Sequence, residues 1–146
     1  MKFQLKDKYN VEDFRQLMAY LRGENGCPWD REQTHESIRR NLLEEAYELA
    51  EAIDEKSQEH MIEELGDVLM QVLFHADIEE KLGNFDIDTV ADGACKKLIL
   101  RHPHVFGDVT VSGSDDVLVN WDAIKRVEKK QDTVTDSLNA VAKNLP

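Results

Sequence analysis

The sequence predicts an all-α fold, an antiparallel helical bundle, on three observations. Apolar residues recur at intervals of three and four along most of the chain, as on one face of an α-helix. Only 3 of the 146 residues are proline and 7 are glycine, which leaves long stretches free to be helical. The trio at 109–111 is the one strand-like segment, and it is too short to build a sheet. The length suits one ordinary domain, which we expect over residues 1–130.

The first expected helix covers residues 11–22. Asn10 and Asp13 resemble a capping box, in which each side chain satisfies a backbone N–H of the other residue. The apolar residues of this stretch follow at helical spacing: Phe14, Leu17, Met18 and Leu21. Two glycines and a Cys-Pro pair interrupt the pattern at 23–29, so a loop is expected there.

Two long helices joined by a short polar turn are expected next. The first begins at Asp30, which resembles a second capping box with Gln33, and runs to about residue 54. Its apolar stripe is Ile38, Leu42, Ala46, Leu49 and Ile53. After a turn near Lys56, Ser57 is the expected N-cap of a helix that ends at a Gly-Asn pair. The apolar stripe of this helix is Met61, Leu65, Val68, Val72 and Ala76.

The last third of the chain predicts two more helices. One covers about residues 89–101 and stops at His102, because a residue that precedes a proline is pushed out of the helical region. A polar loop at 107–115 separates it from a last helix over about 116–130. Residues 131–146 are weakly patterned and are expected to be a weakly structured tail, or a linker to a second domain.

Charge and composition exclude several classes of protein. The net charge is −12, and all of it arises in residues 44–80, which carry 13 acidic and 1 basic side chains. Nucleic acid is therefore not an expected partner, because it repels an acidic protein. No apolar run is long enough to span a bilayer, so no membrane partner is expected. The two cysteines form no CxxC pair and suit a reducing, cytoplasmic setting.

Two pairs of carboxylates stand out in the acidic block. Glu45 and Glu48 are spaced i, i+3, as are Glu64 and Asp67, so each pair shares a helix face. In an antiparallel hairpin centred near residue 56, Glu48 faces Glu64 and Glu45 faces Asp67. Four carboxylates should therefore meet between the two helices. Glu44 and Glu63 point further outward.

Four adjacent carboxylates cannot all stay ionised alone, because like charges raise one another's pKa. Either some are protonated or a hard cation lies among them, and all-oxygen ligands favour Mg²⁺ or Mn²⁺. Mg²⁺ held this way keeps positions open for water and phosphate oxygens, which indicates phosphate chemistry. From the spacing alone, two interpretations are about equally favoured. One is this metal site, and the other is a pair of helices whose acidic side chains face solvent without a metal. A di-iron bundle is disfavoured, because only one Glu-x-x-His tetrad is present, and we find no ligand spacing for His35, His60 or His75.

The pattern Glu44-Glu45-x-x-Glu48, followed by Glu64-x-x-Asp67, resembles the EExxE…ExxD signature of the all-α nucleoside triphosphate pyrophosphohydrolases. Within that superfamily the chain resembles the MazG proteins, from about residue 14 to 130. The resemblance includes Gly-Cys-Pro-Trp-Asp at 26–30 and Arg-His-Pro-His-Val-Phe at 101–106.

This resemblance implies cleavage of a nucleoside triphosphate between its α and β phosphates, in nucleotide-pool housekeeping. It implies that Glu45, Glu48, Glu64 and Asp67 hold the metal, Mg²⁺ with Mn²⁺ as the alternative. A metal-activated water would attack the α-phosphorus, and a carboxylate such as Glu48 or Glu44 would take its proton. The residues leave that choice open. The resemblance also implies that Glu44 lies just outside the metal ligands or orients this water.

The resemblance also implies a role for two i, i+4 pairs, Lys97 with Arg101 and Trp121 with Lys125. Taken alone, the basic residues suit a solvated helix face and the tryptophan suits the core. The resemblance implies triphosphate contacts for the three basic residues, and leaves Trp121 between core packing and base stacking. His60 departs from the family, because some MazG sites carry a lysine there.

The apolar stripes favour a symmetric dimer, because a second copy could cover them. The resemblance implies a homodimer or a dimer of dimers. Two other functions stay open: a non-catalytic dimeric helical module whose acidic face docks a basic partner, and the same fold acting on phosphoribosyl-ATP or on dUTP and dCTP. A P-loop enzyme is disfavoured, because the chain has no GxxxxGK[ST] motif.

Overall fold

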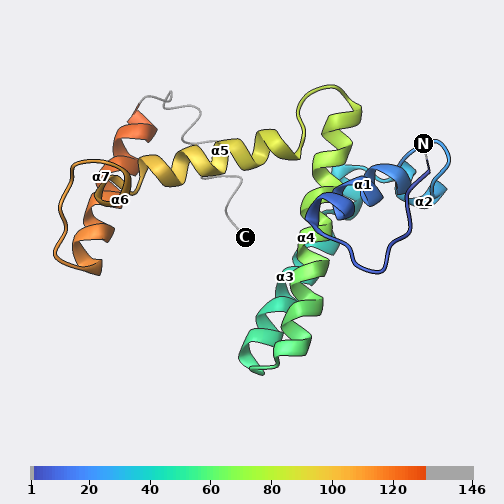
Figure 1. Cartoon of the computed structure of the whole chain (residues 1–146), viewed down its shortest axis with the longest axis horizontal. Coiled ribbons are helices and arrows are strands. Elements are labelled where there is room, and N and C mark those ends of the chain that lie inside the picture. Colours follow the sequence, from blue (N-terminus) through green and yellow to red (C-terminus); the bar gives the residue numbers. More distant parts are fainter. Residues whose placement is uncertain (1, 131–146) are drawn as a thin grey trace. The chain divides into compact units, whose positions relative to one another are not determined.

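The computed structural model describes residues 2–130, which form seven helices and no strand (Figure 1). The helices are α1 (Val11–Leu21), α2 (Pro28–Glu32), α3 (His35–Asp54), α4 (Gln58–Lys81), α5 (Ile87–Leu100), α6 (Pro103–Phe106) and α7 (Ser114–Lys130). The all-α class is confirmed. The tail expected at 131–146 lies outside the described residues. No helix within 2–130 has the length and apolar character needed to cross a membrane.

The chain divides after Val90 into two compact units. The first unit holds α1 to α4, in which α3 and α4 run antiparallel side by side and α1 packs across α4 (Figure 1). The second unit begins inside α5 and includes α6 and α7. That residues 1–130 act as a single domain stays a prediction.

The long helix begins later than the capping pattern predicted. Asp30 lies inside α2, which starts at a proline, and the N-cap of α3 is Thr34. The Thr34 hydroxyl accepts a hydrogen bond from the backbone N–H of Ser37 at 3.1 Å, and Ser37 Oγ accepts one from the Thr34 N–H at 2.8 Å. Gln33 is extended and donates its side-chain amide to the Trp29 carbonyl instead. A nearer capping box therefore replaced the one expected at Asp30.

The turn between α3 and α4 forms where expected. Lys56 has φ of 58°, in the left-handed region that reverses the chain direction. Ser57 is the N-cap of α4, and its hydroxyl accepts a hydrogen bond from the His60 N–H at 3.2 Å. This turn sets the register of the hairpin.

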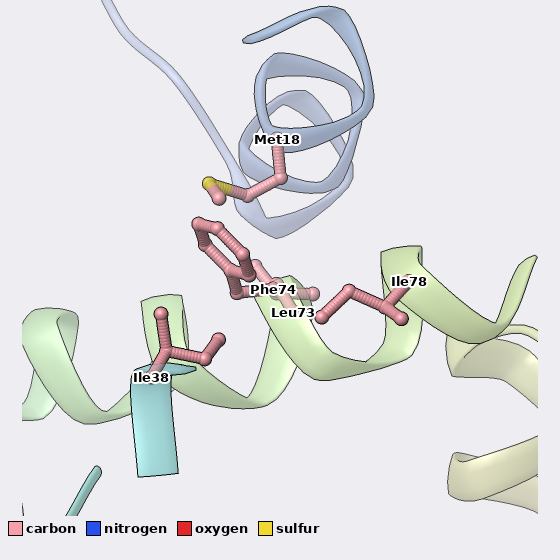
Figure 2. Packing of buried hydrophobic residues seen from close by; sticks show 5 residues of the cluster. All are labelled: Met18, Ile38, Leu73, Phe74 and Ile78. Atoms are coloured by element: carbon pink, nitrogen blue, oxygen red, sulfur yellow. The ribbon is translucent and has the colours of Figure 1, made fainter. Parts of the chain in front are cut away.

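The core of the first unit lies where α1, α3 and α4 meet. Met18 of α1 and Ile38 of α3 pack with three residues of α4, as Figure 2 shows: Leu73, Phe74 and Ile78. The expected stripe on α4 is only partly buried, since Leu65 and Val72 are 50% and 40% exposed. Helix α4 has a second apolar face, outside the expected stripe, and this second face packs against α1.

Candidate functional site

Four carboxylates converge between α3 and α4, in the register expected for the hairpin. One oxygen from each of Glu45, Glu48, Glu64 and Asp67 lies within 4.8 Å of the others. Two residues come from each helix, and the i, i+3 spacing places each pair on one face. Negative charge is therefore concentrated at one point of the hairpin.

Burial and mutual repulsion make two of these carboxyl groups hard to ionise. Burial, a hydrogen bond with Glu48 and the charges of Glu48, Asp67 and Glu64 raise the pKa of Glu45 from 4.5 to about 7. Glu64 is only 8% exposed, and burial, followed by the charges of Glu48 and Asp67, raises its pKa as well. A cation among these groups would reverse the effect by favouring the ionised forms.

The unpaired oxygens of the site indicate what would fit there. Oε2 of Glu45 and Oε2 of Glu64 are both buried and have no hydrogen-bond partner. A buried acceptor without a donor is costly, and a divalent cation would satisfy both oxygens. Since all the ligand atoms are carboxylate oxygens, the residues fit a hard ion such as Mg²⁺ or Mn²⁺.

Glu44 lies outside this convergence. Its carboxylate is exposed and accepts a hydrogen bond from Arg40 Nε at 3.2 Å, one turn earlier on α3. The outward position agrees with the helical spacing. A role for Glu44 in orienting water stays a prediction.

The other predicted site residues lie in the second unit. Lys97 is exposed on α5, and Arg101 donates from Nη2 to Glu128 Oε2 of α7 at 3.0 Å. Trp121 is half-buried, with the edge of its ring against His102 and the ammonium of Lys125 4.8 Å from its ring centre. The tryptophan is therefore neither fully buried nor free of neighbours.

Two histidine arrangements were not expected from the sequence. A ring nitrogen of His60 lies within 4.8 Å of carboxylate oxygens of Glu63 and Glu64. The sequence holds a signal for this group, because residues spaced i, i+3, i+4 share one face of a helix. His35 and His75 lie 40 residues apart and share a hydrogen bond of 2.7 Å between their Nδ1 atoms, a contact for which the sequence holds no local signal.

Comparison with known proteins places this geometry in a family context. Residues 33–106 match the model of the MazG nucleotide pyrophosphohydrolase domain. A nucleoside triphosphate pyrophosphohydrolase/pyrophosphatase MazG of Thermotoga maritima is 51% identical over 81% of this chain and 45% of its own length. A nucleoside triphosphate pyrophosphohydrolase of Escherichia coli K12 is 41% identical over 89% of this chain and 50% of its own.

The chain spans only part of the length of these relatives. The protein YabN of Bacillus subtilis, which is uncharacterised, is 54% identical over 94% of this chain but only 28% of its own length. This chain therefore spans half or less of these three relatives. The crystal structure of a mazG-related protein from Thermotoga maritima matches 79% of this chain and 98% of its own, with a TM-score of 0.66 and 23% identity. That likeness supports the fold.

Proposed function

This chain belongs to the MazG nucleotide pyrophosphohydrolase family, and from that membership we propose that it hydrolyses nucleoside triphosphates to a nucleoside monophosphate and pyrophosphate. The observation that carries the proposal is the convergence of the four carboxylates within the matched segment. Two relatives that cover most of this chain are named for the same activity. A role in nucleotide-pool housekeeping is part of the proposal.

The four carboxylates would hold the catalytic cation, Mg²⁺ in the first instance and Mn²⁺ as its alternative. When bound, such a cation supplies positive charge that neutralises phosphate oxygens and activates water. Glu48 is the exposed member of the four, so its carboxylate is the best placed to take the proton of the attacking water. Glu44, held by Arg40, is the alternative base or a group that orients that water.

The proposed substrate-binding residues all belong to the second unit. Lys97, Arg101 and Lys125 are cations suited to triphosphate oxygens. Arg101 keeps a buried Nε without a hydrogen-bond partner, which leaves a donor for an anionic ligand. Trp121 offers an aromatic face for the base.

We also propose that the chain acts in the cytoplasm as a homodimer or a dimer of dimers. Large apolar side chains stay exposed on α3 and α4: Leu43, Tyr47, Ile53, Ile62, Leu65 and Val72. A second copy of the chain would bury them, as symmetric oligomers do with matching patches. The cytoplasmic setting rests on the cysteine usage, with Cys27 and Cys95 as free thiols.

The test is release of pyrophosphate from a panel of ribo- and deoxynucleoside triphosphates, with Mg²⁺, Mn²⁺ or EDTA, and identification of the nucleotide product. We expect metal-dependent formation of the monophosphate. Glu64→Gln and Asp67→Asn should lower kcat/KM by at least about 100-fold. Loss of a residue that only orients a metal ligand already lowers metal affinity or activity by about 10- to 100-fold. Glu59→Gln, an exposed glutamate of α4, is the charge-matched control.

Each alternative gives its own result in this assay. Orthophosphate with a diphosphate product would move the cut to another bond. Turnover confined to phosphoribosyl-ATP, or to dUTP and dCTP, would keep the fold and change the substrate. No turnover by folded protein at any metal concentration would favour the non-catalytic helical module.

A further inference from the structure

A second group of metal-binding side chains adjoins the four carboxylates on α4. A ring nitrogen of His60 and one oxygen from each of Glu63 and Glu64 all lie within 4.8 Å of one another. His60, Glu63 and Glu64 follow the spacing i, i+3, i+4 and so present one face of the first turns of the helix. Glu64 belongs to both groups.

The burial of Glu64 shows that this group is more than a solvated patch of charge. Its side chain lies at the junction of the two groups, is only 8% exposed, and has a buried Oε2 without a hydrogen-bond partner. An exposed acidic face would hydrate such an oxygen. Here the oxygen lacks both water access and a protein donor, and because Glu64 belongs to both groups, a cation held by either group would satisfy it.

The hydrogen bond of His60 is the one that a metal-binding histidine makes. Its Nδ1 lies 2.9 Å from Oε2 of Glu55, the C-cap residue of α3. When neutral His60 donates its Nδ1–H to that carboxylate, the lone pair of Nε2 is left free. Metal-bound histidines almost always use a carboxylate or carbonyl in this way, because it fixes the tautomer and the ring orientation.

We propose that His60, Glu63 and Glu64 form a second cation site, which binds a first-row transition-metal dication, with Zn²⁺ as the type case. An imidazole ligand favours such ions over Mg²⁺, which prefers the all-oxygen group beside it. Three protein ligands with a position left for water are an ordinary coordination set for Zn²⁺. Since Glu64 has two oxygens and belongs to both groups, one carboxylate would join the two cations.

The site can be tested by binding alone, without turnover. Co²⁺ would be titrated into the full chain in saturating Mg²⁺ and followed by visible absorption, with Zn²⁺ as the competitor. We expect one Co²⁺ per chain, displaced by Zn²⁺. His60→Gln should weaken Co²⁺ binding by at least about 100-fold and Glu55→Gln by about 10-fold, in line with the cost of losing an orienting partner. Glu59→Gln, which removes one nearby charge, should leave binding unchanged, and circular dichroism should show that each variant is folded.

Two results would overturn the site. Equal Co²⁺ and Zn²⁺ affinity in His60→Gln and the unchanged chain would exclude the histidine as a ligand. A near-ultraviolet thiolate charge-transfer band that survives the His60 substitution would place the ion on a cysteine. Because Co²⁺ binding is measured without turnover, and the proposed hydrolysis can be assayed with Mg²⁺ as its one added metal, loss of either proposal leaves the other standing.

Discussion

Arg22 and Asp77 form a buried ion pair between residues 55 positions apart in the sequence. Nη1 of Arg22 lies 2.8 Å from Oδ2 of Asp77, and the side chains are 6% and 5% exposed. Nε of Arg22 also donates to the Asp30 carbonyl at 3.1 Å, and the guanidinium lies over the ring of Phe74. One side chain therefore connects the end of α1, the α2 segment and α4.

Replacement of Arg22 by methionine should destabilise the protein by about 3 kcal/mol, because it leaves the Asp77 charge buried with a weakened set of partners. Lys81, whose Nζ lies 2.6 Å from Asp77 Oδ2, would retain part of the interaction. Urea denaturation followed by circular dichroism measures the change. Arg40→Gln, which removes an exposed pair with Glu44, should cost about 0.5 kcal/mol or less. Equal losses in the two variants would contradict the importance of the buried pair.

The sequence could predict the helices because their signals are local. The box formed by Asn10 and Asp13, the turn at Lys56 and the cap at Ser57 each depend on residues within one helical turn of one another. The predicted start of α3 was wrong because two capping patterns compete near residues 30–37. The proline at the start of α2 decides between them. The Arg22–Asp77 pair has no local signal at all, so only the packed structure reveals it.

The convergence of the four carboxylates could also be predicted, since it follows from helical spacing and the centre of one turn. The group of His60, Glu63 and Glu64 has the same kind of signal, the spacing i, i+3, i+4, so the sequence did hold a ligand pattern at His60. The hydrogen bond between His35 and His75 depends on the packing of α3 against α4 and could not be predicted.

In the absence of metal, the protein should lose stability as the pH rises from about 4.5 to about 7. The pKa of Glu45 rises from 4.5 to about 7 on folding, so between these values the folded state binds more protons than the unfolded state. The contribution of Glu45 to the free energy of unfolding then falls with pH and levels off above about 7. Thermal unfolding in EDTA across this range measures it.

Glu45→Gln should remove that contribution, since glutamine has no proton to lose. In EDTA at pH 8 the variant should be more stable than the unchanged protein. Saturating Mg²⁺ should reverse the order, because only the unchanged protein gains free energy by binding the ion to a complete set of ligands. Parallel pH profiles for the two proteins in EDTA would contradict the raised pKa of Glu45.

The proposed homodimer should dissociate when a charge is placed on the exposed apolar face of α3 and α4. Leu65 is 50% exposed and follows Ile62 by one helical turn. Leu65→Lys would bury an ammonium against the apolar face of a second copy, which is costly. Sedimentation velocity at equal concentrations should show a monomer, whereas Leu5→Lys, a change at an 84% exposed position outside this face, should sediment as the unchanged chain. A monomeric unchanged protein would refute the homodimer.

Trp121→Ala should raise KM for nucleoside triphosphates by about 10-fold with a smaller change in kcat, because stacking of a base on an aromatic ring contributes about 1–3 kcal/mol to binding. The ammonium of Lys125 lies over the Trp121 ring, and the His102 ring contacts it in an edge-to-face arrangement. These contacts hold the indole in place for a planar ligand. Trp121→Phe should restore most of the affinity. Inhibition by inorganic triphosphate, which has no base, should be the same in all three proteins. If Trp121 served only to pack the second unit, the alanine variant would instead lose thermal stability and weaken nucleoside triphosphate and inorganic triphosphate alike.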